Sequence, residues 1–120
     1  MDFLTKEQIL HAQDIEEKEV PVPEWGGKVL VRGLTGKQRD IFEKSLIEGK
    51  GKDRQVNLEN ARAKLVSLTV VDPKTKKPLF SQKDVELLGE KSGRAINRVY
   101  DVASELSGIG EAEIEELTKN

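Results

Sequence analysis

The chain has 120 residues, of which 36% are hydrophobic and 35% are charged, and its formal net charge is −2. This length suits a single domain over residues 1–120, and the low apolar share predicts one thin core beneath wide solvated surfaces. The absence of cysteine excludes disulfide bonds and cysteine-ligated zinc. No apolar run approaches the roughly 20 residues that a membrane-spanning helix needs.

Charge is divided unevenly along the chain. Residues 1–24 hold seven acidic and two basic side chains, a net of −5. Residues 25–100 hold seventeen basic and nine acidic ones, a net of +8, and residues 101–120 hold six acidic and one basic, a net of −5. The acidic ends could fold over the basic middle, or the end of one molecule could meet the middle of the next. Ordinary surface charge is the simpler interpretation, and we expect residues 1–18 and 109–120 to be loosely held.

The first quarter of the chain predicts a short helix and a β-hairpin. A capping box that starts at Thr5 opens a helix over residues 6–13. Residues 19–33 alternate valine with proline and then give a short β-branched run, which predicts a hairpin that reverses near Gly26. Trp25 is the only tryptophan. It either covers the apolar face of this hairpin, which we favour, or anchors a partner.

The next segment predicts a second helix and a basic loop. Thr35 opens a helix that runs to about residue 49, again with a capping box. Residues 48–55 are spaced by glycines and rich in bases, which is typical of an irregular loop. This loop is not a phosphate-binding loop, because it follows a helix and has Asp53 where serine or threonine is required.

Asn57 is expected to cap a helix over residues 58–69. Its apolar residues step by three and four along one narrow seam: Leu58, Ala61, Leu65 and Leu68. The apolar pairs at 70–71 and 79–80 could form a short ribbon or simply both turn inward. Between them, the lysines of residues 72–78 have no interleaved aromatic side chain, so a nucleic-acid role is not favoured.

The last part of the chain predicts three helices. A short one covers residues 82–88. The best-patterned segment, residues 93–107, carries a broad apolar stripe, with Ser92 as its N-cap and Gly108 as its left-handed C-terminal residue. Residues 111–119 form a last, short and glutamate-rich helix, which is marginal alone.

These elements predict a mainly α (α+β) fold class, a small bundle of about six helices with an N-terminal β-hairpin near residues 19–33. Nothing in the sequence points to a reaction centre. His11 is the only histidine, and the glutamates at 16–17 and 113–116 look fully solvated, whereas an acid-base pair needs one buried carboxylate. The serines lack a nucleophile-elbow pattern. We therefore expect no enzyme activity and no catalytic, cofactor-binding or metal-binding residues.

Three segments carry a family resemblance. Residues 25–35 give a strand-turn-helix pattern. Residues 65–80 give a helix end, followed by Val-Asp-Pro at 71–73 and Pro-Leu-Phe at 78–80. Residues 95–108 lead to a Leu-Ser-Gly helix stop, with an acidic tail beyond it. Together these segments resemble the tail assembly chaperones of long-tailed bacteriophages and prophages.

The resemblance implies an interaction protein without chemistry. Such chaperones bind the long, apolar tape measure protein and keep it soluble until tail tube subunits replace them. The resemblance also implies a protein of the host bacterial cytoplasm that is absent from the mature virion. Contact with the tail tube protein and self-association are further expectations. Many members are made in two lengths by a ribosomal frameshift, and an acidic tail ending at Asn120 suits the shorter form.

A surface that covers an apolar partner needs exposed apolar side chains with a charged rim. Our candidate partner contacts are Trp25, Leu58, Leu65, Leu68, Ile114 and Leu117. Core packing is an equal alternative for the leucine seam. Two other functions stay open: a minor tail or head-tail connector protein, and, less favoured, a small nucleic-acid-binding protein that uses the basic middle.

Overall fold

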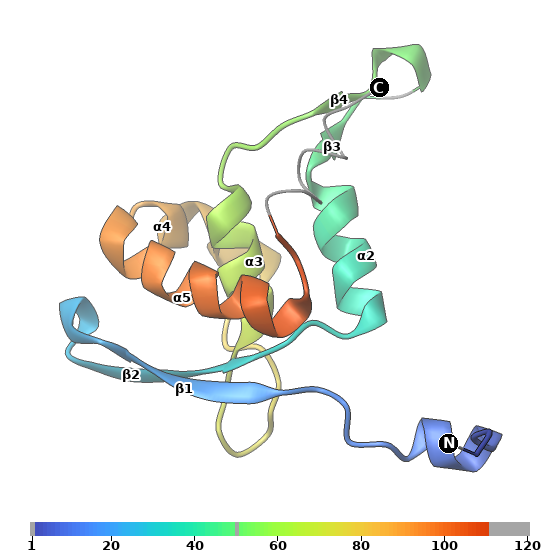
Figure 1. Cartoon of the computed structure of the whole chain (residues 1–120). Coiled ribbons are helices and arrows are strands. Elements are labelled where there is room, and N and C mark those ends of the chain that lie inside the picture. Colours follow the sequence, from blue (N-terminus) through green and yellow to red (C-terminus); the bar gives the residue numbers. More distant parts are fainter. Residues whose placement is uncertain (1, 50, 111–120) are drawn as a thin grey trace.

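The longest helix, α5 (Gly93–Ser107), packs against a small antiparallel sheet and against α3 (Ala61–Thr69), as Figure 1 shows. The computed structural model describes residues 2–49 and 51–110. In that part, the other α-helices are α1 (Lys6–Leu10), α2 (Gly36–Ser45) and α4 (Val85–Gly89). The sheet order is β1-β2-β5, with β1 (Glu17–Val22), β2 (Gly27–Arg32) and β5 (Val70–Val71). The fold class is therefore α+β, as predicted.

The predicted N-terminal hairpin is confirmed, with β1 paired antiparallel to β2 in a register that sets Val20 opposite Val29. The chain reverses through a short 3-10 helix, η1 (Pro23–Trp25), and Gly26, whose φ of 75° lies in the left-handed region. Val20 and Val22 point into the core while the proline between them is exposed. Because proline donates no ladder hydrogen bond, β1 is found at the edge of the sheet.

The apolar pairs at 70–71 and 79–80 do form a ribbon, since the Leu79 N–H donates to the Val70 carbonyl at 3.0 Å. The first pair is β5, which joins β2 as the third strand of the sheet. The lysine-rich loop between them is held to β1, because the Lys76 ammonium lies 2.6 Å from a Glu17 carboxylate oxygen. The loop is therefore part of the sheet layer.

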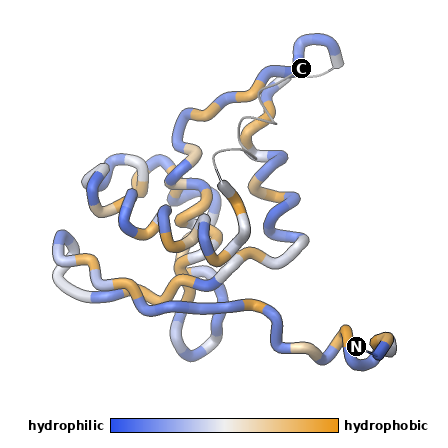
Figure 2. The backbone as a smooth tube through the Cα atoms, viewed as in Figure 1, coloured by the Kyte–Doolittle hydropathy of each residue, from blue (hydrophilic) through white to orange (hydrophobic). Residues whose placement is uncertain are grey.

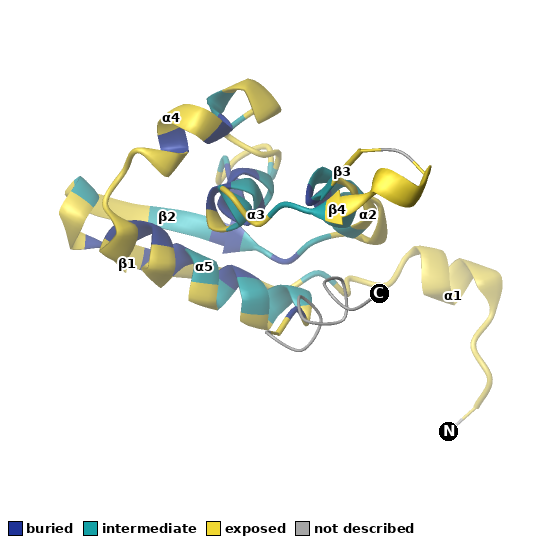
Figure 3. Ribbon diagram, turned by 90° about the horizontal axis from the view of Figure 1, so that it is seen from above, coloured by how far each residue is buried: buried dark blue, intermediate teal, exposed yellow. Residues whose placement is uncertain are grey.

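The predicted helix 93–107 is confirmed as α5, with both of its predicted caps. The Ser92 hydroxyl accepts a hydrogen bond from the Ala95 N–H at 3.3 Å. Gly108 has a φ of 68°, which suits a residue without a side chain. The helix buries one face and leaves the other exposed, as the colours of Figure 3 show.

The core lies where that face meets the sheet and α3, and it continues to α2, which packs on α3. Its fully buried side chains include Val22, Val31, Phe42, Leu46, Leu65 and Val99. Figure 2 shows the corresponding alternation of hydrophobic and hydrophilic positions along the helices. A core built mainly of valine, leucine and alanine is thin, in agreement with the low apolar share of the sequence.

The helix expected to begin at residue 58 begins at Ala61 instead. The Asn57 carboxamide oxygen accepts from the Glu59 N–H at 2.8 Å, so it closes a local turn and caps no helix. The Asn57 N–H donates to the Leu46 carbonyl at 2.6 Å. This contact with the end of α2 holds the segment extended. Asn60 then takes a left-handed conformation, with a φ of 61°, before the helix starts.

The prediction of an irregular loop over residues 48–55 is also wrong in part. A two-stranded ladder pairs β3 (Ile47–Glu48) with β4 (Gln55–Val56), and the 3-10 helix η2 (Gly51–Asp53) lies between them. Gly49 permits the reversal with a φ of 86°. The glycines that suggested an irregular loop serve a hairpin instead.

The expected count of about six helices differs from the five α-helices in the described ranges. The sixth was expected over residues 111–119, which lie outside those ranges. The first helix ends at Leu10, earlier than the expected residue 13, and α2 ends at Ser45, earlier than the expected residue 49. The helix expected over residues 82–88 starts as a 3-10 turn, η3 (Gln82–Asp84), and continues as α4.

The C-terminal end of α5 is locked to the junction between β2 and α2. The Leu34 N–H donates to the Ser107 hydroxyl at 3.1 Å. Gly33 is so close to the helix that a Cβ at this position would lie 2.7 Å from the Leu106 carbonyl oxygen. Two of the segments that carry the family resemblance, residues 25–35 and 95–108, therefore meet here.

Replacing Gly33 with alanine is expected to destabilise the protein by about 1–3 kcal/mol, because the added methyl group overlaps the backbone of α5. Gly36→Ala is the matched control, since nothing lies within 4 Å of a Cβ at that position and alanine favours a helix. Urea unfolding of both variants measures the difference. Equal free energies of unfolding would show that the junction is not tightly packed.

The tip of the hairpin is held to α5 by Glu24, whose carboxylate oxygens accept from the Arg98 Nε–H at 3.0 and 3.1 Å. A backbone N–H hydrogen bond is the main cause that holds the pKa of Glu24 below its ordinary value of 4.5, and Arg98 adds to it against the opposing effect of desolvation. A lowered folded-state pKa means that this stabilisation is present above about pH 4.5 and is lost as the pH falls through the folded-state pKa.

Glu24→Gln is therefore expected to lower the melting temperature at neutral pH and to have a smaller effect at about pH 3, because part of the stabilisation by Glu24 is lost once the pH is below the ordinary value of 4.5. Thermal unfolding followed by circular dichroism at the two pH values gives both differences. Glu90→Gln is the control, because Glu90 forms no ion pair within the described ranges. A Glu24→Gln effect of the same size at both pH values would contradict the assignment.

Candidate partner-binding surface

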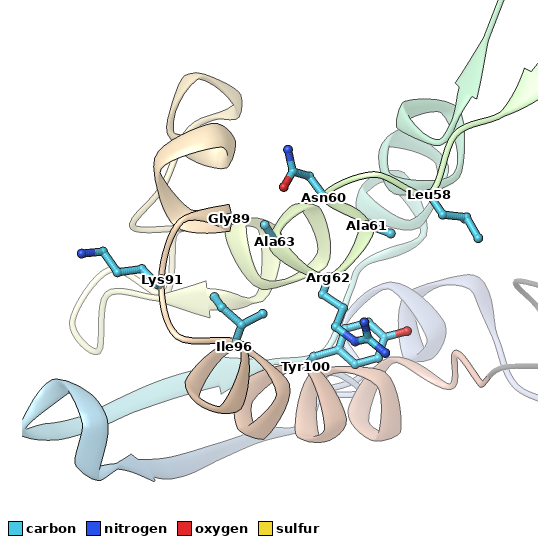
Figure 4. Close-up of a pocket in the computed structure, with 10 residues that line it drawn as sticks. Leu58, Asn60, Ala61, Arg62, Ala63, Gly89, Lys91, Ile96 and Tyr100 are labelled. Carbon is cyan, nitrogen blue, oxygen red and sulfur yellow. The ribbon is translucent and has the colours of Figure 1, made fainter.

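A cleft of about 440 Å³ lies between the start of α3, the connection from α4 to α5, and the first turns of α5 (Figure 4). We call it the α3–α5 cleft. It is lined by Leu58, Asn60, Ala61, Arg62, Ala63, Gly89, Lys91, Gly93, Ile96 and Tyr100. Most of these residues are apolar or small, because alanine and glycine at the helix contacts leave room that larger side chains would fill.

The α3–α5 cleft has an apolar base and two cations, one in its middle and one at an end. Ala63 and Ile96 are 3% and 6% exposed, and they belong to the core cluster. At one end, Leu58 is 46% exposed. The Arg62 guanidinium lies 5.3 Å from the centre of the Tyr100 ring, in a cation–π contact. Figure 4 shows this pair in the middle of the cleft, with Lys91 at the end opposite Leu58.

The charged side chains that line the α3–α5 cleft are all basic. Arg62 and Lys91 are basic, and the lining includes no carboxylate. In the described part of the chain, neither cation forms an ion pair. The Glu86 carboxylate accepts from the Asn60 side-chain amide at 3.1 Å, but it lines a different cleft. The α3–α5 cleft therefore attracts negative charge at its rim and apolar groups at its base.

A second cleft, of about 360 Å³, lies on the other side of Lys91, and we call it the α4 cleft. It is lined by Leu79, Phe80, Asp84, Leu87, Leu88 and Lys91. Leu79 and Leu87 are 54% and 70% exposed. Because both clefts share Lys91, the two hollows are adjacent, and we call them together the surface around α4.

The spacing of apolar residues in α4 is a sequence signal for the exposure of Leu87. Val85 and Leu88, three positions apart, are the buried residues of α4. Neighbouring residues on a helix point about 100° apart, so Leu87 must leave the face that Leu88 occupies. A short helix with one apolar residue too many for its buried face therefore exposes that residue.

A third cleft, of about 220 Å³, lies between α2 and α3 and extends to the start of α4. Leu68 lines it with Ile41 and Val85, and its charged lining residues, Lys64 and Glu86, are of opposite sign. We call it the α2–α3 cleft. Its smaller volume and balanced charge distinguish it from the α3–α5 cleft.

The N-terminal helix exposes a separate set of apolar side chains. None of the residues of α1 is buried, and Figures 1 and 3 both show α1 apart from the other elements. The exposed side chains are Phe3, Leu4, Ile9 and Leu10. An amphipathic segment of this kind is a further candidate contact.

The residues predicted to contact a partner lie in different environments. Leu58 lines the α3–α5 cleft and Leu68 the α2–α3 cleft, whereas Leu65 is fully buried in the core. Trp25 is half-buried against the core cluster, at the end of the hairpin. The remaining two, Ile114 and Leu117, lie outside the described ranges. Whether any of these residues contacts a partner stays a prediction.

Over residues 2–49 and 51–110, no three histidine, cysteine, aspartate or glutamate side chains are gathered as ligands for a metal ion. In the same ranges, no helix combines the length and the hydrophobicity needed to cross a membrane.

Comparison with known proteins decides the family. The sequence model of a family described as "Phage tail assembly chaperone" matches residues 5–120. The chain belongs to the phage tail assembly chaperone family. No curated protein matches the chain. The structure of the bacteriophage HK97 tail assembly chaperone is similar in fold, with a TM-score of 0.58 and 24% identity over 83% of this chain and 94% of that chain.

The family resemblance stated from the three sequence segments is thus confirmed, and the similar fold agrees with it. Tail assembly chaperones are not a known class of enzymes. In this tail assembly chaperone, the surface around α4 is where apolar side chains and hollows coincide.

Two leucines of the predicted seam should respond differently to truncation. Leu65→Ala is expected to cost about 2–5 kcal/mol of stability, because it leaves a cavity in the core. Leu58→Ala should change stability by less than about 1 kcal/mol, since its side chain is partly solvated already. Guanidinium unfolding of both variants makes the comparison. Similar losses would mean that the rim of the α3–α5 cleft is as tightly packed as the core.

Proposed function

We propose that this chaperone binds the tape measure protein of its phage in the host cytoplasm and keeps it soluble until tail tube subunits assemble around it. The observation that carries the proposal is membership of the tail assembly chaperone family over residues 5–120. The action is binding alone, without a chemical step. The protein is then expected to leave before the virion is complete.

The surface around α4 is suited to this role. A long apolar protein aggregates unless its apolar side chains are covered, and the chaperone offers Leu58, Leu79 and Leu87 beside two clefts. Burial of one leucine contributes roughly 1.5–3 kcal/mol, while association costs roughly 4–15 kcal/mol. One such surface therefore binds weakly. Stable protection needs either a longer contact or several chaperone copies along the partner, with self-association as one way to arrange them.

The test is co-expression with the tape measure protein of the same phage. The wild-type chaperone is expected to move the tape measure protein from the pellet to the supernatant and to co-purify with it. Leu79→Ser with Leu87→Ser should return most of it to the pellet, because both side chains are exposed and their loss spares the core. Lys74→Ser with Lys77→Ser, at two exposed positions of the 72–78 loop, is the control.

Two results would count against the proposal. One is a tape measure protein that stays as insoluble with the chaperone as without it. The other is the presence of this chain in purified virions, measured by mass spectrometry in stoichiometric amounts. That second result would favour a minor tail or head-tail connector protein.

A further inference from the structure

We infer that the α3–α5 cleft selects for partner segments that are both apolar and acidic, such as an amphipathic helix whose apolar stripe is bordered by glutamate or aspartate. This inference rests on the proposed function and adds the chemistry of the segment that is recognised. It concerns the cleft defined above, whose ends are Leu58 and Lys91.

The first argument is the sign of the charge in each hollow. The α3–α5 cleft is lined by Arg62 and Lys91 and by no acidic side chain. The α4 cleft combines Asp84 with Lys91. The α2–α3 cleft combines Lys64 with Glu86. Only a lining of one sign discriminates strongly between acidic and basic partners, and among these three clefts that condition holds for the first.

The second argument is that both cations are available. The Arg62 guanidinium is held over the Tyr100 ring and not by a carboxylate. Its N–H groups can therefore bind a carboxylate of a partner bidentately. Lys91 is exposed, and its ammonium forms no ion pair within the described ranges. Elsewhere on the domain, cations such as Lys28 and Arg98 are already paired with glutamates.

The third argument is the apolar base between the two cations. Ala61, Ala63 and Ile96 line the cleft between Leu58 and Lys91. A volume of about 440 Å³ is within the range in which proteins hold small ligands or a few side chains. A segment that places apolar side chains on this base brings its neighbouring residues close to Arg62 and Lys91. A nucleic acid would gain little here, because the Tyr100 face is covered by Arg62.

The experiment uses two synthetic helical peptides with the same leucine stripe, one bordered by glutamates and the other by lysines at the same positions. Fluorescence anisotropy measures their binding to the full chain. The glutamate peptide is expected to bind about tenfold more tightly at low salt. This preference should shrink as salt is added, because the rim is solvated.

Variants locate the preference. Arg62→Glu with Lys91→Glu should reverse it, and Leu58→Asp should weaken the binding of the glutamate peptide. Lys37→Glu with Lys44→Glu changes the net charge by the same amount on the exposed face of α2, and it should keep the preference. Circular dichroism of each variant checks that it is folded.

Several outcomes would overturn the inference. These are equal binding of the two peptides, a preference that survives Arg62→Glu with Lys91→Glu, and displacement of the glutamate peptide by a single-stranded DNA oligonucleotide. A further such outcome is that the wild type sediments as a dimer and the Arg62→Glu, Lys91→Glu variant sediments as a monomer. A second copy of the chain would then occupy the cleft.

The inference and the proposed function can fail separately. If the Arg62→Glu, Lys91→Glu variant still solubilises the tape measure protein fully, the inference fails and the function stands. If the wild type does not solubilise that protein but the peptides are discriminated as expected, the function fails and the selectivity of the cleft stands.

Discussion

The structure depends on covering the apolar face of α5. Ala95, Ile96, Val99 and Ala103 are buried along it, and no single neighbour is broad enough to cover them all. The hairpin covers one side and α3 the other. Glu24 on the hairpin tip binds Arg98 in the first half of the helix, and the Ser107 hydroxyl at its C-terminal end accepts from the Leu34 N–H. The helix and the sheet therefore form one frame, held by packing along its length and by these two polar contacts.

This frame explains where the apolar surplus lies. The α4 segment is attached to it through only two buried side chains, Val85 and Leu88, so Leu87 is left at the surface. The small residues that line the α3–α5 cleft keep α3 and α5 close at the core and leave a hollow above it. A chaperone that covers an apolar partner needs such a combination: a rigid core that does not reorganise, and an apolar surface that is not needed for folding.

The sequence predicted the family and the local elements better than the exposure of individual apolar side chains. The leucine seam shows why. The spacing predicts one helix face for Leu58, Leu65 and Leu68, but Leu58 lies before the helix starts and only Leu65 is fully buried. Leu79 and Leu87, outside this seam, are more exposed than any of its leucines. Exposure depends on which neighbours arrive from elsewhere in the chain, and the spacing of leucines does not record that.

The sequence by itself determined the features whose physics is confined to a few neighbouring residues. These are the capping boxes, the Ser92 and Gly108 caps of α5, the valine and proline alternation of β1, and the amphipathic stripe of the long helix. Only the tertiary structure decided the start of α3, the β3–β4 ladder and the basic sign of the α3–α5 cleft. The first two follow from pairings between neighbouring segments, such as Asn57 with Leu46 and Ile47 with Val56. The third follows from Arg62 and Lys91, which lie further apart in the chain. Local propensity cannot place them, because their free energy arises only once the core has brought the segments together.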